Sequence, residues 1–311
     1  MVLLAIHLSS FYLKRALQLC KMNKCRKIVP GSVLGIICPS GHPSTIEQVN
    51  KFCNLLTEHG YRYKLGKSVT AVEGYLAGSD ALRAEDLMDM FEDNSVDAIL
   101  CFKGGYGAQR MLPYLDFEKI KKHPKLLMGF SDVTILLNTL NQFADMPTVH
   151  GEMGVCMQQY EEFTFNHFFE TLLNGFVNPL KNPTLPLNII NEGVAEGIIV
   201  GGNLSLIYAL MGTPYEINFD DKILFIEEVN EAPYAVDRML SSLILSGKLK
   251  TLKGIICGYF TGCSSTENQT VEELLNHYLK PLNIPMVTNF QSGHSKPFIN
   301  LPIGLKVKLD T

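Results

Sequence analysis

The sequence has no tryptophan, no CxxC pair and almost no excess of charge of one sign. Lysine and arginine number 27 against 31 aspartates and glutamates, so the formal net charge is −4. A chain with this balance has no strong positive field, which argues against nucleic acid as a partner. The histidines and cysteines show no HExxH motif and no clustered spacing, so the sequence predicts no metal site.

The eight cysteines are scattered along the chain and do not form a disulfide pattern. Cys38 lies in the apolar run GIICPS, and Cys257 lies in the apolar run GIICGYF. Such positions are typical of buried, reduced thiols. The cysteines therefore indicate a reducing compartment, and we expect the protein to be cytoplasmic.

A long hydrophobic run is also missing. The longest stretch without charge, residues 197–215, is interrupted by four glycines and a proline, so it is typical of strand, turn and helix and not of a membrane span. Residues 1–21 place apolar residues first and Lys14 and Arg15 afterwards, which is the reverse of a signal peptide. We interpret these residues as a start-site extension or a peripheral helix, and we expect no membrane partner.

From Pro30 onward, short apolar strands alternate with segments of helical periodicity. This alternation predicts βαβ units and an α/β fold, with a doubly wound, mostly parallel sheet in residues 30–150. Residues 1–29 precede this domain and are predicted to be an N-terminal extension and the segment that leads into the first strand. Residues 151–188 are predicted to form a helix and a proline-rich linker, and residues 189–311 to form a smaller, mixed, β-rich domain. Functional residues of parallel sheets gather at the carboxyl ends of the strands.

Ser131 lies at a sharp strand-to-helix turn, because the apolar strand LLM runs into Gly-Phe-Ser-Asp and a helix follows directly. A serine in this position presents its hydroxyl at the sheet edge, close to the free N–H groups of the helix, which suits a nucleophile. Serine is also a preferred helix N-cap, and Val133 replaces the second glycine of the hydrolase motif G-x-S-x-G. From these residues alone, both interpretations stay open.

The segment KGGYG, residues 103–107, is a glycine-rich turn after a strand. Adjacent glycines let backbone N–H groups approach a ligand closely, as an oxyanion hole or a phosphate site requires. The spacing matches neither of the glycine motifs of nucleotide-binding proteins. An ordinary tight turn would explain the segment as well.

Two acids and one histidine complete the set of candidates. Glu227 and Glu228 follow the apolar strand ILFI, where a carboxylate is well placed to orient a histidine, although a solvated loop would also explain them. His294 in QSGHSKP follows a strand and is flanked by small residues, and His42 and His150 adjoin turns near strand ends. The other histidines lie in helical or charged surroundings, and we expect them at the surface.

The stretch KGGYGAQRMLPYLDFEKIKKHPKLLMGFSDVT resembles the serine LD-carboxypeptidases, the muramoyltetrapeptide carboxypeptidases. The resemblance covers about residues 30–309 in the same order, through GYLAGSDALRAEDL, HGEMG, GGNLSLIYALMGTPYE, ILFIEEVNEAPYAVDRML and GHSKPFINLPIG. It implies a catalytic triad in which Ser131 is the nucleophile, His294 is the base and Glu227 is the orienting acid.

The resemblance also implies an oxyanion hole made of backbone N–H groups, which falls on Gly104, Gly105 and Asp132. Candidates for binding the substrate are Lys103, Tyr106 and His150. Two positions depart from the family pattern, since Lys103 stands where arginine usually precedes GGYG, and Glu152 stands where HGP is usual. Neither departure touches the triad, so both bear on specificity.

The resemblance therefore predicts a serine hydrolase without metal or cofactor that releases the terminal D-alanine from murein tetrapeptides by cleaving an L,D peptide bond, in cell-wall recycling. The murein peptide is then the partner, and we expect a homodimer. One alternative is a hydrolase of peptide–nucleotide antibiotics of the microcin C type, from a self-immunity branch of the same superfamily. The other alternative is a non-catalytic peptide-binding protein of the same fold.

Deleting residues 1–21 is expected to leave the melting temperature and the hydrolytic activity unchanged, because the first strand of the sheet is predicted to begin only near Val33. Thermal unfolding and product analysis of the truncated and full-length chains measure this. A loss of soluble protein on deletion would mean that these residues pack against the core.

Overall fold

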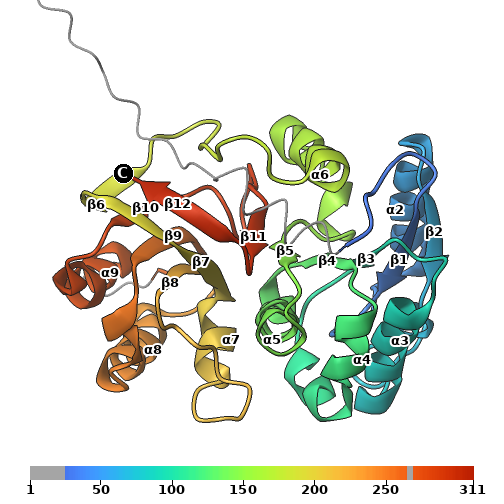
Figure 1. Ribbon diagram of the computed structural model, residues 1–311, viewed down its shortest axis with the longest axis horizontal. Helices are drawn as coiled ribbons and strands as arrows, with labels where there is room; N and C mark the ends of the chain where they lie inside the picture. Colours follow the sequence, from blue (N-terminus) through green and yellow to red (C-terminus); the bar gives the residue numbers. More distant parts are fainter. Residues whose placement is uncertain (1–24, 265–268) are drawn as a thin grey trace, which may run out of the picture.

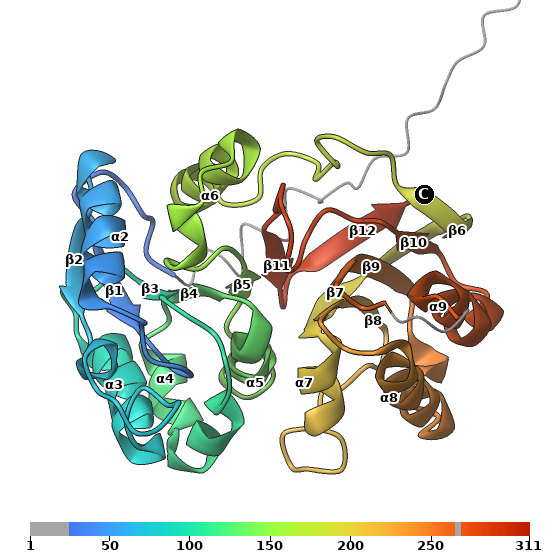
Figure 2. The ribbon, with the colours of Figure 1, turned by 180° about the vertical axis from the view of Figure 1, so that it is seen from behind.

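Two six-stranded sheets form the framework of the protein and lie next to each other (Figures 1 and 2). The computed structural model describes residues 25–264 and 269–311, so the extension predicted for residues 1–21 lies outside the described residues. The strand order is β11-β5-β4-β3-β1-β2 in the first sheet and β12-β7-β8-β9-β10-β6 in the second. The first sheet occupies the right half of Figure 1 and the second sheet the left half.

The first sheet is parallel except at one edge. Its strands are β1 (Val33–Ile37), β2 (Arg62–Leu65), β3 (Ala98–Cys101), β4 (Leu126–Gly129), β5 (Thr148–His150) and β11 (Leu301–Ile303). Strand β11 pairs antiparallel with β5, and all other neighbours pair in parallel. The mostly parallel α/β sheet predicted from the sequence is thus confirmed, and its first strand begins at Val33 as expected.

The helices that accompany the first sheet are α2 (Ile46–Glu58), α3 (Asp80–Glu92), α4 (Phe117–Lys122), α5 (Thr134–Ala144) and α6 (Glu162–Asn174). They form where the sequence combines a cap with an apolar stripe. In α3, the hydroxyl of Ser79 accepts a hydrogen bond from the N–H of Leu82 at 3.2 Å, which makes Ser79 the N-cap. In α2, Val49 and Phe52 are buried at a helical spacing.

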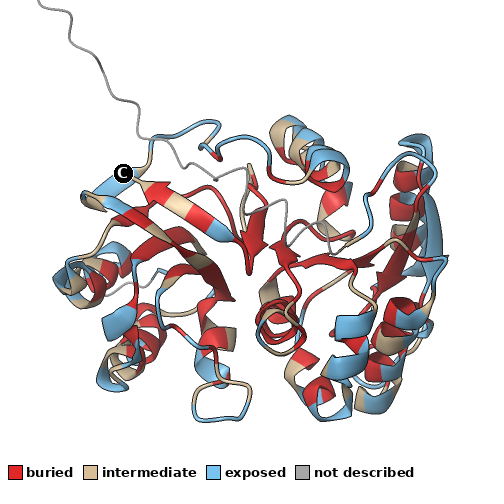
Figure 3. Cartoon of the chain, viewed as in Figure 1, coloured by how far each residue is buried: buried red, intermediate tan, exposed pale blue. Residues whose placement is uncertain are grey.

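The second sheet is mixed. Its strands are β6 (Asn188–Asn191), β7 (Val194–Asn203), β8 (Lys222–Val229), β9 (Gly254–Thr261), β10 (Met286–Thr288) and β12 (Lys306–Asp310), and its helices are α7 (Leu204–Ala209), α8 (Pro233–Leu245) and α9 (Val271–Leu279). Strands β7 to β10 pair in parallel, while the edge strands β12 and β6 pair antiparallel. The central strands are buried on both faces (Figure 3), which explains their continuous apolar sequences.

The chain crosses between the two sheets near its end. Strand β10 lies in the second sheet, whereas the next strand, β11, lies in the first. The connecting segment, residues 289–300, therefore spans both sheets and carries His294. The predicted domain boundaries stay a prediction, and one strand of the predicted segment 189–311 belongs to the first sheet. Among the helices that the structure describes, none has the length and apolar character that a bilayer crossing requires.

The two sheets are joined through Asn138 of α5, which is 2% exposed. Its Nδ2 donates to the carbonyl of Gly201 on β7 at 2.9 Å, and its Oδ1 accepts from the N–H of Gly201 at 2.9 Å. The approach is close, since a Cβ added at Gly202 would lie 2.5 Å from Oγ1 of Thr134. Helix α5, which begins beside Ser131, is thus held against the second sheet.

Replacing Asn138 by alanine leaves a buried backbone N–H and C=O of Gly201 without their partner, so we expect Asn138→Ala to lower the free energy of unfolding by about 2–3 kcal/mol. Urea unfolding measures the change. Asn54→Ala, at an exposed position of α2, is the matched control and should change it by less than about 0.5 kcal/mol. Equal effects of the two variants would show that the hydrogen bonds between Asn138 and Gly201 do not contribute to the free energy of unfolding.

Candidate active site

Ser131 follows β4 in a left-handed backbone conformation, with φ at +61°. This region costs a non-glycine residue about 1–3 kcal/mol, and such residues cluster at functional sites. The one-turn 3-10 helix Ser131–Val133 begins here and continues into α5. The N-cap residue of this 3-10 helix is Phe130, and no side chain accepts a capping hydrogen bond there. Helix capping therefore does not account for the serine.

The carboxylate of Asp132 connects the ends of three neighbouring strands. It is 1% exposed, and its Oδ2 accepts from the hydroxyl of Ser40 at 2.6 Å and from the N–H of Ala108 at 2.8 Å. Ser40 lies beyond β1 and Ala108 beyond β3, while Asp132 itself follows β4. These bonds fix the glycine-rich turn against the strand end that carries Ser131.

The glycine-rich turn lies directly against the Ser131 side chain. A Cβ added at Gly104 would lie 3.1 Å from Cβ and 3.2 Å from Oγ of Ser131, so only glycine allows this approach. Gly105 has a φ of +122°, which a residue with a side chain rarely adopts. The backbone at Gly104 and Gly105 therefore borders the serine hydroxyl, which is where an oxyanion hole is needed. The roles of these N–H groups and that of Asp132 stay a prediction.

Glu227 and His294 form a hydrogen bond of 2.7 Å between Oε2 of the carboxylate and Nδ1 of the ring. Glu227 lies near the carboxyl end of β8, inside the strand and not after it as the sequence suggested, and it is wholly buried. The side chain of His294 is 18% exposed. With Nδ1 donating to Glu227, Nε2 is the nitrogen left to exchange a proton with a substrate group or a nucleophile.

Glu228, the second acid of the pair, forms hydrogen bonds with other residues. Oε1 of Glu228 accepts from Nδ2 of Asn203 at 2.8 Å, and Oε2 accepts from the N–H of Ser205 at 2.7 Å. Successive side chains of a strand point to opposite faces, so only one acid of the pair can face the histidine. The structure gives that position to Glu227, whose catalytic role stays a prediction.

The pKa of His294 reflects two opposing influences. Burial of the ring is the largest single influence and lowers it, but the hydrogen bond with Glu227 and the negative charges of Glu227, Glu228 and Glu152 together outweigh burial, so the net pKa lies above its usual 6.5. The ring also lies 4.9 Å from the ring of Phe130, centroid to centroid, and Phe130 is the neighbour of Ser131 in the chain. The structure thus brings His294, Glu227 and the strand end of Ser131 together.

His150 lies deep in the core and not at the surface of the site. Its ring stacks on Phe298 at 5.5 Å and meets Phe225 edge-on at 4.9 Å, and the residue is 0% exposed. Burial lowers its pKa to about 3, so the ring is neutral. Neither ring nitrogen has a hydrogen-bond partner among the described residues. This placement does not support the substrate contact expected for His150.

Lys103 and Tyr106 border the glycine-rich turn. Nζ of Lys103 donates to the carbonyl of His42 at 2.9 Å, and the ring of Tyr106, 45% exposed, meets Tyr75 edge-on at 5.8 Å. Both side chains lie beside the backbone that approaches Ser131. Their contacts with a substrate stay a prediction.

Three features of the site come from the structure, namely the bridging carboxylate of Asp132 and two charged side chains that line a cavity. The bridging carboxylate of Asp132 was assigned only a backbone role. Glu152 and Lys296 line a cavity of about 440 Å³ that also includes His294 and Phe130. The sequence pointed to Glu152, because this residue departs from the family pattern. For Lys296 the only indication in the sequence is its position two residues after His294.

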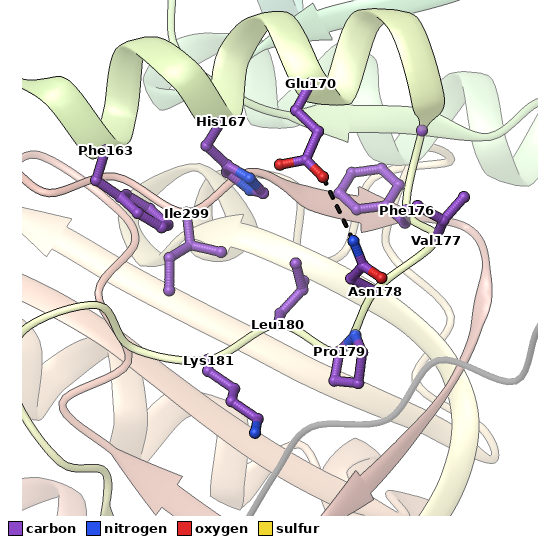
Figure 4. Close-up of a pocket in the computed structure, with 11 residues that line it drawn as sticks. Phe163, His167, Glu170, Phe176, Val177, Asn178, Pro179, Leu180, Lys181 and Ile299 are labelled. Atoms are coloured by element: carbon purple, nitrogen blue, oxygen red, sulfur yellow. Dashed lines mark hydrogen bonds between the residues drawn. The ribbon is translucent and has the colours of Figure 1, made fainter.

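A second cavity, of about 240 Å³, lies between α6 and residues 175–181 (Figure 4). It contains none of the predicted site residues. His167 points into it, and Oε1 of Glu170 accepts a 3.4 Å hydrogen bond from Asn178 across it. His167 was expected at the surface, and the structure shows it half-buried, with its Nε2 enclosed and without a partner within residues 25–264 and 269–311.

In residues 25–264 and 269–311, acidic, histidine and cysteine side chains do not gather into a metal site. Across the part of the chain that the structure describes, no three of them come together in a group that could hold a metal ion. The hydrolysis expected without a metal stays a prediction.

Comparison with known protein families finds two matches. The LD-carboxypeptidase N-terminal domain matches residues 34–151, which include Ser131. The LD-carboxypeptidase C-terminal domain matches residues 196–309, which include Glu227 and His294. Among curated proteins, the probable murein peptide carboxypeptidase of Bacillus subtilis is 35% identical over 297 residues, which cover 93% of this chain and 92% of the relative.

Solved structures share the fold. The muramoyltetrapeptide carboxypeptidase from Oxalobacter formigenes superposes with a TM-score of 0.74 at 26% identity, over 90% of this chain and 99% of that one. An MccF-like protein from Bacillus anthracis gives a TM-score of 0.80 at 27% identity, over 92% and 99% of the two chains.

His294 is expected to titrate above pH 6.5, and Glu227→Gln, which removes the negative charge and keeps the volume, should lower its pKa by about one unit or more. NMR titration of histidine-labelled protein measures this, with His294→Ala identifying the resonance. Glu228→Gln is the control, and it should shift the pKa less because its oxygens face Asn203 and Ser205. An unchanged pKa in Glu227→Gln would contradict the pairing.

Proposed function

Because the chain belongs to the LD-carboxypeptidase family, we propose that it is a serine carboxypeptidase that removes the terminal D-alanine from murein tetrapeptides at an L,D peptide bond. One observation carries the proposal. The 2.7 Å hydrogen bond from His294 to the buried Glu227 leaves the second ring nitrogen free of Glu227, beside the strand end where Ser131 is held in a strained conformation. This is the arrangement that activates a serine for nucleophilic attack.

In the first half of the reaction, Oγ of Ser131 attacks the carbonyl carbon of the residue before D-alanine, and Nε2 of His294 takes the serine proton. Glu227 holds the imidazole in the required tautomer and stabilises its positive charge. The carbonyl oxygen becomes an oxyanion that accepts hydrogen bonds from the backbone N–H groups at Gly104 or Gly105 and at Asp132. Each donor of this kind stabilises the transition state by about 3 kcal/mol.

In the second half, His294 gives its proton to the nitrogen of D-alanine, the C–N bond breaks, and the rest of the peptide remains as an ester on Ser131. A water molecule then attacks the ester carbon while His294 accepts one of its protons. Return of that proton to Oγ of Ser131 releases the tripeptide and restores the enzyme. Every proton transfer uses the same ring nitrogen, which is why its pKa has to lie near the working pH.

The cellular setting is also part of the proposal. Cys38, Cys101 and Cys257 are buried free thiols, and burial raises the pKa of Cys38 to about 12, so it is not reactive as a thiolate. These reduced cysteines support a cytoplasmic location, where the enzyme would act on recycled cell-wall peptides. The homodimer stays a prediction, which sedimentation equilibrium tests.

The likeness to the MccF-like protein supports a second candidate, the hydrolysis of peptide–nucleotide compounds of the microcin C type. The absence of tryptophan removes one residue type that stacks on nucleobases, and the GGYG turn and the EAPYAVDRML segment resemble the carboxypeptidase branch. Mass spectrometry of the products from a murein tetrapeptide and from a peptidyl nucleotide distinguishes the two candidates. A non-catalytic binding protein would cleave neither and would not react with a fluorophosphonate.

Ser131→Ala is expected to reduce kcat/KM for a murein tetrapeptide by at least about three orders of magnitude while the protein stays folded, because it removes the nucleophile. Release of D-alanine measures the rate, and circular dichroism checks the fold. Both proteins are dialysed against EDTA first, and the wild-type activity should survive. Activity lost to EDTA and restored by zinc, or more than about a tenth of activity retained by Ser131→Ala, would contradict the serine mechanism.

A further inference from the structure

The cavity of about 440 Å³ next to His294 is in position to receive part of the substrate. Its wall includes His294 and Phe130, the residue directly before Ser131. A peptide whose carbonyl carbon lies at Ser131 therefore has groups within a few bonds of this cavity. The volume is within the range of small-molecule binding sites.

Glu152 lines this cavity with a carboxyl group that lacks a full set of partners. The residue is 4% exposed, and its Oε2 has no hydrogen-bond partner among the described residues. The backbone is fixed, since the N–H of Glu152 donates to Oδ1 of Asn300 at 3.2 Å. Burying an unpaired polar atom costs free energy, so a bound group that donates to Oε2 would be favoured.

The charge of the cavity determines which group fits. Burial raises the pKa of Glu152 to about 7, against the lowering effects of Lys296 and of a hydrogen bond with Cys156. A bound cation stabilises the ionised carboxylate, whereas a bound anion is repelled by it. Lys296 does not neutralise Glu152 directly, because its Nζ donates to the carbonyls of Cys156, at 3.1 Å, and Gln159.

We propose that Glu152 determines specificity by binding an ammonium group at the end of the side chain of the third residue of the stem peptide. The proposal rests on the proposed function. The leaving D-alanine offers a methyl group and a carboxylate, so it supplies no ammonium. The side chain of the third residue begins on the carbon bonded to the attacked carbonyl. It ends in an ammonium in lysine, and in an ammonium that shares its carbon with a carboxylate in diaminopimelate.

The experiment compares three tetrapeptide stems that differ only at the third residue, which is lysine, diaminopimelate or norleucine. Norleucine keeps the four-carbon chain of lysine and lacks the ammonium. The wild-type enzyme is expected to show kcat/KM at least about tenfold higher for the lysine or the diaminopimelate stem than for the norleucine stem. Whichever cationic stem has the higher value identifies the natural third residue.

Glu152→Gln is expected to lower kcat/KM for the cationic stems by about tenfold or more, mainly through KM, and to leave the norleucine stem nearly unchanged. Glu162→Gln, at an exposed position of α6, is the matched control and should alter none of the three. A merely structural role of Glu152 would instead lower all three stems by the same factor, which would overturn the proposal.

The wild-type comparison keeps the inference testable even when the variant does not fold. Equal rates for the norleucine and cationic stems in the wild-type enzyme would overturn the ammonium site and leave the carboxypeptidase reaction intact. Cleavage of none of the three stems would overturn the proposed function itself. The two failures are therefore distinguishable.

Discussion

The hydrogen bond between Glu227 and His294 depends on both sheets, and the rest of the site is arranged around it. Glu227 belongs to β8 of the second sheet, whereas Ser131 follows β4 of the first. His294 lies in the segment 289–300, which leaves the second sheet and enters the first. A histidine carried by this crossing segment can reach an acid on one sheet and a serine on the other. Any change in how the sheets pack therefore alters the geometry of all three groups.

The strained conformation of Ser131 needs compensation close by. A left-handed serine is unfavourable by about 1–3 kcal/mol, so the surrounding structure has to hold it in place. The buried carboxylate of Asp132 does so through its bonds to Ser40 and Ala108, which belong to the two neighbouring strand ends. The same bonds place the glycine-rich turn against the serine hydroxyl. One carboxylate thus stabilises the conformation of Ser131 and positions the backbone proposed to bind the oxyanion.

Buried carboxyl groups in this protein differ according to their partners. Glu228 is saturated by Asn203 and Ser205 and supports the packing of α7 against β8. Oε2 of Glu227 bonds to His294, and its Oε1 has no partner among the described residues, as is also true of Oε2 of Glu152. Full partnering thus marks the acid that stabilises the fold, whereas the other two acids keep an open oxygen, one next to the histidine and one in the cavity proposed to bind substrate.

The sequence by itself determined the local elements, because capping and apolar periodicity act over a few residues. In this way the alternation of strands and helices predicted the parallel sheet. The order of the family motifs pointed to the serine, the acid and the histidine. Only the tertiary structure decided that His150 is enclosed by aromatic rings and that Asp132 bonds to Ser40, 92 residues away. Such contacts depend on how the strand ends and the two sheets pack, which no short stretch of sequence encodes.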